Sequence, residues 1–323
     1  MNIHFSRQVY GRMKAAVFYE YGDIDVLQIA DVPKPSISDN EILVKVKAAA
    51  VNPKDTFIRK GRFKRFTGNQ FPQLVGFDFS GEVAESNHPH YKIGDAVSGM
   101  LEGWHGGSAA EYVAVKAHQL AKKPDAVSFE DAAAVPLVAL TTLQALRDDA
   151  RIKPGDKVCI NGASGGVGTM AVQIAKIYGA EVTAIASQSN HDFLKTLGAD
   201  YCIDYRETNI TSSNSKFNIF FDVFGNTRFA SIKPILTENG TWVSTVIQPH
   251  VFVSMGLSYF SSKTAKLVVV KAQTDDFKLI GEWMEARKLK AIIHDTYPLE
   301  KIADAHRQQQ SKHTRGKLVI HVQ

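Results

Sequence analysis

The residues best suited to do chemistry form a glycine-rich segment, GASGGVGTMAVQIAK, near the middle of the chain. A strand-like segment precedes it and an amphipathic helical segment follows, which is the context that a dinucleotide-binding turn requires. Small residues let the backbone approach a diphosphate, and the free N–H groups of a helix start attract phosphate. A glycine-rich turn without a ligand is the alternative that this context disfavours. The predicted contacts are Ala163, Ser164, Gly165, Gly166, Val167 and Gly168, with Ala163 where the first glycine normally stands.

The next predicted strand, residues 181–186, indicates which dinucleotide is bound. In a fold that prefers NAD, this strand ends in a carboxylate that binds the ribose hydroxyls. Here it ends in Ser187-Gln188-Ser189-Asn190-His191, with no carboxylate before Asp192. Hydroxyl and amide groups donate to a 2′-phosphate, whereas a carboxylate repels it. The sequence therefore predicts NADPH, although Ser187 and Ser189 can also cap the following helix.

Two kinds of domain are needed to position this turn. From residue 128 onward, strands (157–160, 181–186, 219–223, 241–246, 267–270) alternate with helices (167–178, 191–197, 275–287), which predicts a parallel sheet covered on both faces. Ser128 is predicted to cap the first helix of this part, with Asp131 three residues later. The first third has short strand-like runs (15–19, 42–49, 79–85, 109–115) between turns, which indicates a β-rich domain. The tail, residues 292–323, ends in a strand-like run (317–322) and is predicted to fold back onto that domain.

Composition limits the class of protein. A chain of 323 residues fits two domains, and 44% hydrophobic with 22% charged residues is typical of a globular protein without membrane spans. The net charge of +5 is spread along the chain and favours an anionic small ligand over nucleic acid. With only two cysteines, a reducing compartment, the cytoplasm, is expected. The first 13 residues lack a secretory pattern and are expected to be a disordered extension, with a short organelle-targeting arm as the open alternative.

Several stretches resemble one known family. AAAVNPKDTFIRKG (48–61), FPQLVGFDFSGEV (71–83), the glycine-rich segment and LGADYCIDYRE (197–207) resemble the zinc-independent quinone oxidoreductases, the zeta-crystallin branch of the medium-chain dehydrogenase/reductase superfamily, close to the alkenal and enone reductases. The resemblance implies an α/β architecture with two domains. A GroES-like catalytic domain would span residues 14–127, completed by 289–323, and a Rossmann NADPH-binding domain with a doubly wound parallel sheet would span 128–288.

Zinc-dependent relatives carry metal ligands where this chain has Asn52 and Phe77, and a third ligand near Leu137. None of these residues is a usual zinc ligand, so no metal site is expected. Without a Lewis acid, a plain alcohol is hard to activate. The expected substrate is instead an electron-poor acceptor, a quinone or an α,β-unsaturated ketone or aldehyde.

The resemblance also implies residue roles. Asn52 would lie beside the nicotinamide, and Lys54 is the nearest candidate to polarise a developing enolate, although a solvated ammonium is the favoured interpretation. Asp55 would order its loop, while Arg59 and Lys60 are expected to be solvated. Further cofactor contacts are implied at Phe57 (often Tyr in the family), Thr141, Ser187, Asn190 (often Lys), Tyr205, Phe224, Gly225, Asn226, Val243, Ser244, Thr245 and Val246.

The function expected from these features is hydride transfer from NADPH to a quinone or enone, with the proton supplied by water or a cofactor hydroxyl. Two alternatives stay open. One is an enoyl-thioester reductase, for which the basic run Lys60-Gly-Arg62-Phe-Lys64-Arg65 could hold a pantetheine carrier, although such runs are usually only solvated. The other is a nucleotide-dependent binding protein with little catalysis. A homodimer is expected through the sheet edge near residues 241–246 and 267–270.

Overall fold

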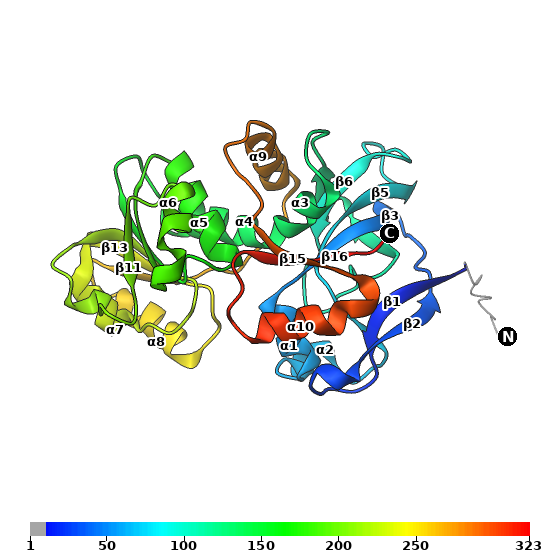
Figure 1. The fold of residues 1–323 in the computed structure, drawn as a ribbon, viewed down its shortest axis with the longest axis horizontal. Coiled ribbons are helices and arrows are strands. Elements are labelled where there is room, and N and C mark those ends of the chain that lie inside the picture. Colours follow the sequence, from blue (N-terminus) through cyan, green and yellow to red (C-terminus); the bar gives the residue numbers. More distant parts are fainter. Residues whose placement is uncertain (1–10) are drawn as a thin grey trace.

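The computed structural model describes residues 11–323. Residues 1–10 of the expected disordered extension lie outside the described residues, and the expectation is wrong for Arg12 and Met13, which already pair with β2 as part of β1. Figure 1 shows two lobes, one built from the first third and the tail of the chain and one from the middle. This is the α/β architecture expected from the sequence. The exact domain limits, 127/128 and 288/289, stay a prediction; α3 (Phe129–Ala134) packs on strands of the first lobe.

The first lobe is built on two sheets. A seven-stranded sheet runs in the order β15-β16-β3-β5-β6-β8, with β7 also paired to β3. Because β15 and β16 come from the tail, the prediction that the tail folds back onto the β-rich domain is confirmed. The strands of the two sheets are β15 (Ile293–Pro298), β16 (Lys317–His321), β3 (Glu41–Val51), β5 (Asp78–Ser86), β6 (Ala96–Met100), β8 (Leu120–Lys122) and β7 (Tyr112–Lys116), and, in a smaller sheet, β2 (Leu27–Pro33), β1 (Arg12–Phe18) and β4 (Gln73–Leu74).

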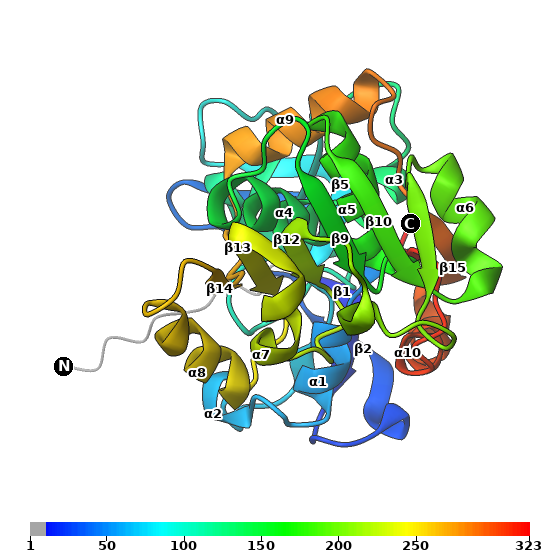
Figure 2. The ribbon, with the colours of Figure 1, turned by 90° about the vertical axis from the view of Figure 1, so that its left-hand side faces the viewer.

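The second lobe holds a six-stranded parallel sheet in the order β11-β10-β9-β12-β13-β14 (Figure 2). Counted within the lobe this order is 3-2-1-4-5-6, the arrangement of a dinucleotide-binding fold, in which the strand order reverses between the first and fourth strands. The strands are β9 (Lys157–Asn161), β10 (Glu181–Ala186), β11 (Tyr201–Asp204), β12 (Phe217–Asp222), β13 (Leu236–Ser244) and β14 (Thr264–Leu267).

Helices cover both faces of this sheet and link the lobes. Ser128 caps α3 by accepting a hydrogen bond from the Asp131 N–H at 3.0 Å, as predicted. The helix expected to continue from there is interrupted at Pro136, which starts α4, and residues 144–149 form a π-helical turn. The helices are α1 (Pro53–Arg59), α2 (Lys64–Thr67), α3, α4 (Pro136–Leu143), α5 (Gly166–Ile177), α6 (His191–Thr196), α7 (Phe229–Ile232), α8 (Pro249–Ser258), α9 (Thr274–Glu285) and α10 (Ile302–Gln310).

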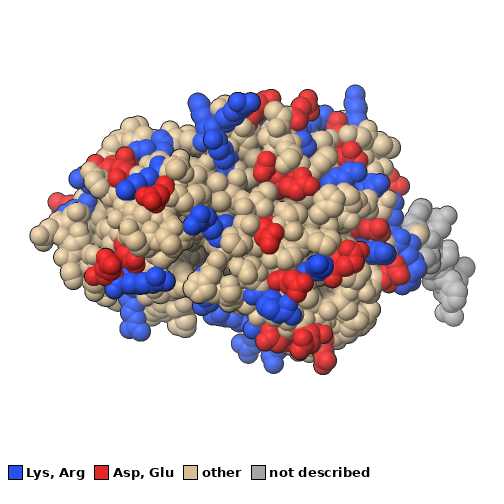
Figure 3. Space-filling view, in the orientation of Figure 1, with Lys and Arg blue, Asp and Glu red and all other residues tan. Residues whose placement is uncertain are grey.

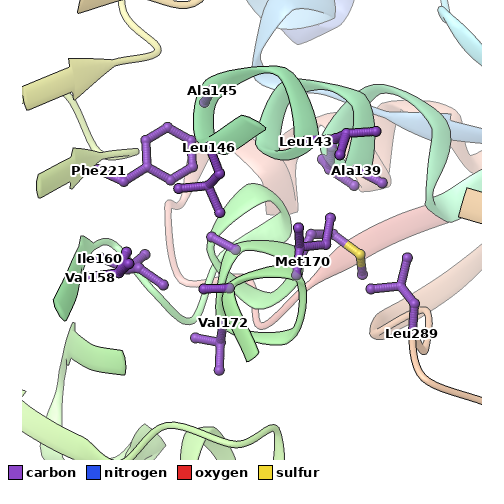
Figure 4. Packing of buried hydrophobic residues seen from close by; sticks show 14 of the residues in the cluster. Ala139, Leu143, Ala145, Leu146, Val158, Ile160, Met170, Val172, Phe221 and Leu289 are labelled. Carbon is purple, nitrogen blue, oxygen red and sulfur yellow. The ribbon is translucent and has the colours of Figure 1, made fainter. Parts of the chain in front are cut away.

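The main core of the second lobe lies between α4, α5 and the sheet. Leu146, Ile160, Met170 and Phe221 come from four different elements and pack together with less than 2% of each exposed (Figure 4). At roughly 25 cal/mol per Å² of buried apolar surface, such side chains hold the helix start of α5 firmly against the end of β9. That junction contains the glycine-rich turn.

Candidate active site

The glycine-rich turn has the shape that a dinucleotide turn needs. Gly162 has a φ of +85°, which favours glycine. A Cβ on Gly168 would lie 2.2 Å from the Gly162 oxygen, so only glycine lets α5 start this close to the turn. A Cβ on Gly165, in contrast, would meet only that oxygen, at 3.7 Å, so the space in front of Gly165 is open. Ala163 is fully buried and its N–H bonds the Ile185 oxygen at 3.1 Å, so it shapes the turn from behind.

The open side of this turn fits an anion. Ser164, Gly165, Gly166 and Val167 are all partly exposed, and the first N–H groups of α5 lack intrahelical partners. A helix of 12 residues adds partial positive charge at this end. The turn residues therefore fit the diphosphate of a dinucleotide, as the sequence predicted.

The ends of β12 and β13 meet the turn from the side. A Cβ on Gly162 would lie 3.1 Å from the Phe224 Cβ, and a Cβ on Gly225 would lie 2.2 Å from Val246. Thr245 donates through Oγ1 to the Val223 oxygen at 3.0 Å. The structure therefore brings together the expected cofactor contacts from both strand ends, Phe224, Gly225, Asn226, Val243, Ser244, Thr245 and Val246, although Val243 and Ser244 themselves are buried.

Two residues that the sequence analysis did not single out, Asp222 and Asn161, fix the backbone after β12. Asp222 is fully buried, and its Oδ1 accepts hydrogen bonds from the Gly225 N–H at 2.9 Å and from Asn161 Nδ2 at 2.8 Å. Asn161 Nδ2 also donates to Asn226 Oδ1 at 2.7 Å. The sequence signal that could have identified them is a polar residue at the end of each of two buried strands.

The turn after β10 contains the residues expected near a 2′-phosphate. Ser187, Ser189 and Asn190 form a short hydrogen-bonded cluster that is partly open to solvent, and Tyr205 is 56% exposed. The carboxylate of Asp204, at the end of β11, accepts a hydrogen bond from the Gln188 N–H at 2.9 Å. An anion bound here would meet that negative charge, so it would need a cation beside it.

Asn52 and Leu137, at or near two of the positions where zinc-dependent relatives carry ligands, are joined through Asp78, the residue after Phe77. Asn52 Nδ2 donates to Asp78 Oδ2 at 2.8 Å, and the Leu137 N–H donates to Asp78 Oδ1 at 2.8 Å. Lys317, from β16, supplies the cation: its Nζ donates to Asn52 Oδ1 at 2.5 Å and to Asp78 Oδ2 at 3.2 Å. Lys317 is 4% exposed and Asp78 is fully buried. The sequence missed this ion pair.

This arrangement does not fit zinc. The Asn52 amide already has both of its polar ends bonded, with Nδ2 also 3.4 Å from the Ala50 oxygen, and Phe77 and Leu137 have no ligating atom in their side chains. In residues 11–323, no group of three or more His, Cys, Asp or Glu side chains is placed to hold a metal ion. Asn52 is also 1% exposed, so it acts through its neighbours more than through a free amide.

Lys54 lies beside this cluster and is not the solvated ammonium that the sequence favoured. Its Nζ lies 3.8 Å from the centre of the Phe77 ring and 5.3 Å from that of Trp104, and donates to the Gly103 oxygen at 2.5 Å. Burial, only partly offset by Asp55, Asp78 and Glu102, lowers the pKa of Lys54 to about 8. An ammonium with this pKa gives up its proton readily near neutral pH.

Aromatic side chains border Lys54. Trp104 stacks on Phe66 with ring centres 5.1 Å apart and tilts against Phe63 at 4.6 Å. Phe66 is 60% exposed, and Phe57, the position that is often Tyr in the family, is partly buried with Arg62 over its ring. Flat apolar faces of this kind suit a flat conjugated ligand.

Asp55, Arg59 and Thr141, on α1 and α4, are the other residues of these helices to which the sequence analysis gave a role. Asp55 orders its loop as expected, because its carboxylate accepts from the Asn52 N–H at 2.7 Å and the Gly76 N–H at 3.0 Å. The expectation that Arg59 is solvated is wrong: it is fully buried and donates to the Gly22 oxygen at 2.9 Å. Thr141 is 6% exposed, and its hydroxyl donates to the Leu137 oxygen at 2.7 Å within α4.

Comparisons with known proteins agree with this geometry. Residues 38–125 match the family described as alcohol dehydrogenase GroES-like domain, and residues 197–320 match the one described as zinc-binding dehydrogenase. A chloroplastic quinone-oxidoreductase homolog of Spinacia oleracea is 32% identical over 93% of this chain and 95% of its own length. A chloroplastic NADPH-dependent alkenal/one oxidoreductase of Arabidopsis thaliana is 31% identical over 99% of this chain and 82% of its own length.

Among solved structures, the quinone oxidoreductase from Coxiella burnetii superposes with a TM-score of 0.91 at 33% identity, over 97% of this chain and all of that one. The superposition with that quinone oxidoreductase thus covers both lobes of the chain. This chain belongs to the medium-chain dehydrogenase/reductase superfamily of oxidoreductases, in the zinc-independent branch of the quinone oxidoreductases and the alkenal and enone reductases.

Proposed function

We propose that the protein is an NADPH-dependent reductase that transfers hydride, without zinc, to quinones or α,β-unsaturated carbonyl compounds. The observation that carries the proposal is Lys54, an ammonium with a pKa of about 8 that lies near the rings of Phe77 and Trp104, the second of which stacks on the exposed ring of Phe66. An acid at that place serves an acceptor that gains negative charge on oxygen.

The chain's own groups divide the work. Ser164, Gly165 and the start of α5 bind the diphosphate, and the ends of β12 and β13 orient the rest of the nucleotide. The aromatic rings position a flat acceptor and exclude water from it. Lys54 then supplies the proton to the acceptor oxygen, a role that the sequence alone assigned to water or a cofactor hydroxyl.

Steady-state turnover tests this proposal. With NADPH, the purified protein should oxidise the nucleotide when given a quinone or an enone, and should do nothing with ethanol and NADP⁺. A chelator should leave the rate unchanged. Alcohol oxidation that a chelator abolishes would overturn the proposal, and a preference for crotonyl thioester over a free enone would favour the enoyl-thioester alternative.

A homodimer belongs to the same proposal, with its contact revised. Residues 241–244 lie in β13, between β12 and β14, so of the two expected contact segments only the one next to β14 lies at an edge of the sheet. Next to it, α8 and the turn after it expose apolar side chains, among them Leu257 at 64%, Tyr259 at 89% and Phe260 at 91%. Light scattering should give twice the chain mass, and Phe260→Asp should give the monomer.

The remaining expectations concern partners and location. On the face drawn in Figure 3, basic and acidic side chains are interspersed, so no basic stripe suited to nucleic acid covers it. Within residues 11–323, no helix combines the length and the apolar character that a membrane crossing requires. A cytoplasmic location stays a prediction, since several relatives are described as chloroplastic or mitochondrial.

A further inference from the structure

The segment between α10 and β16, residues 311–316, links the first lobe to the nucleotide turn. We call it the C-terminal strap; its sequence, SKHTRG, is basic. The Gly316 N–H donates to the Ser164 oxygen at 3.0 Å, which pairs the strap with the glycine-rich turn. Gly316 has a φ of +78°, and a Cβ there would lie 2.1 Å from the Ile292 oxygen. The strap is thereby fixed on the side of the first lobe that faces the second (Figure 1).

Arg315, the residue before this fixed point, reaches the turn after β10. Its Nε donates to Asn190 Oδ1 at 2.9 Å, and its Nη2 lies 3.3 Å from the Ser189 oxygen. The guanidinium also lies 4.8 Å from the centre of the Phe193 ring. A guanidinium carries five N–H donors, so three remain for another acceptor after these two bonds. The Arg315 side chain remains exposed, so those donors are accessible.

The Asn190 amide and the Ser187 hydroxyl continue this hydrogen-bonded chain from Arg315. Because Asn190 Oδ1 accepts from Arg315, its Nδ2 is the end that donates to Ser187 Oγ, at 2.9 Å. Ser187 Oγ accepts that bond, which leaves its own hydroxyl hydrogen free to donate; Ser189 Oγ lies 3.2 Å away. The result is one positive charge and two hydroxyls at the place where the ribose of the adenosine half lies in this kind of sheet.

We propose that Arg315 is the residue that makes this protein select a nucleotide with a 2′-phosphate. The inference rests on the proposed NADPH dependence and deepens it. The family often has a lysine at position 190; here Asn190 instead holds a guanidinium donated from the other lobe. The carboxylate of Asp204, which accepts a hydrogen bond from the Gln188 N–H at 2.9 Å, repels a phosphate, and Arg315 adds a positive charge at the same turn.

Binding measurements on the whole protein test the inference without any acceptor. Fluorescence titration should give NADPH a lower Kd than NADH for the wild type. Arg315→Gln should raise the NADPH Kd by about 10- to 100-fold, the worth of a charge-assisted hydrogen bond to phosphate, and should leave the NADH Kd within about twofold. Arg315→Lys should give an intermediate NADPH Kd, because an ammonium keeps the positive charge but cannot form the two parallel hydrogen bonds of a guanidinium. Calorimetry with 2′,5′-ADP against 5′-AMP should show the same difference.

The matched control is Arg307→Gln on α10, an exposed arginine that pairs with Asp304 and has no contact with the turn after β10. It should change neither Kd. Equal losses for NADPH and NADH in Arg315→Gln would show a merely structural role and would overturn the inference, as would no loss at all. A wild type that binds NADPH tightly but reduces no quinone or enone would sink the proposed function alone. A wild type that binds neither nucleotide would sink both.

Discussion

Lys317 Nζ donates a hydrogen bond to Asn52 Oδ1 at 2.5 Å, joining two residues 265 positions apart in the chain. Asp78 Oδ2 lies 3.2 Å from the same Nζ and completes a buried ion pair. Asn52 stands at a position where the family resemblance places a zinc ligand in zinc-dependent relatives, and here it is bonded to an internal cation. Through this contact the last strand of the chain fixes the first residues of α1.

Removing one member of this pair should be costly. Lys317→Met leaves the Asp78 carboxylate buried without its cation, so the free energy of unfolding should fall by about 3–5 kcal/mol. Adding Asp78→Asn should restore part of that loss, and urea denaturation of the four proteins in this cycle measures the coupling. Lys278→Met breaks the exposed Lys278–Asp275 pair, at 3.3 Å, and should cost less than about 1 kcal/mol. Strictly additive losses would contradict the coupling.

Gly168 should be irreplaceable for nucleotide binding. In Gly168→Ala the new Cβ would lie 2.2 Å from the Gly162 oxygen, so the start of α5 must shift, at about 1–3 kcal/mol in stability, and NADPH binding should be lost. Gly256→Ala, in α8, meets nothing within 4 Å and should instead stabilise by up to about 1 kcal/mol. Thermal unfolding and NADPH titration of both variants check this. Unaltered NADPH affinity in Gly168→Ala would argue against the turn as the diphosphate site.

The part of the site that could be predicted is the part whose residues are consecutive in the sequence. The turn at Gly165 and Gly168 could be placed because its strand, glycines and helix are consecutive, and hydrophobic periodicity marked most of the parallel sheet. β14 was placed a few residues late, because residues 267–270 are apolar and only Thr264–Leu267 pair with β13. α8 and α10 were missed, since one is apolar around much of its surface and the other lies in a polar tail.

The rest of the site depends on contacts between distant segments. Nothing near Lys317 or Arg315 in the sequence shows that one lies against Asn52 and the other against Asn190. Lys54 was expected in solvent, but its Nζ lies against the ring of Phe77, a distant residue just before β5. Arg59 is similar: charge suggested exposure, while α1 turns it inward. Charged residues are placed by such tertiary partners, which local patterns do not encode.

His306 should make the protein acid-sensitive. It is 1% exposed beside Arg59, and burial, reinforced by that charge, lowers its pKa from 6.5 to about 3. The unfolded chain therefore binds a proton that the folded chain refuses, so this stability is present above pH 6.5 and is lost as the pH falls toward 3. In His306→Gln, the free energy of unfolding should drop less between pH 7 and pH 4 than in the wild type. The exposed His105→Gln is the control, and identical drops in all three proteins would remove His306 as a cause.

Lys54 gives the pH dependence of turnover. Because its pKa is about 8, the ammonium is present below that pH and is lost above it. With an enone that has no ionisable group, kcat/KM should be flat at neutral pH and fall about tenfold per unit well above pH 8. Lys54→Met should lose about 10²- to 10⁴-fold in kcat and show no such fall, whereas Lys54→Arg should keep a flat profile to higher pH. Lys60→Met, six residues further along and 43% exposed, should behave as the wild type. If kcat/KM of Lys54→Met still falls above about pH 8, the proton comes from another group. The aromatic rings of Phe63, Phe66 and Trp104 would then be the only part of this site that acts on the acceptor.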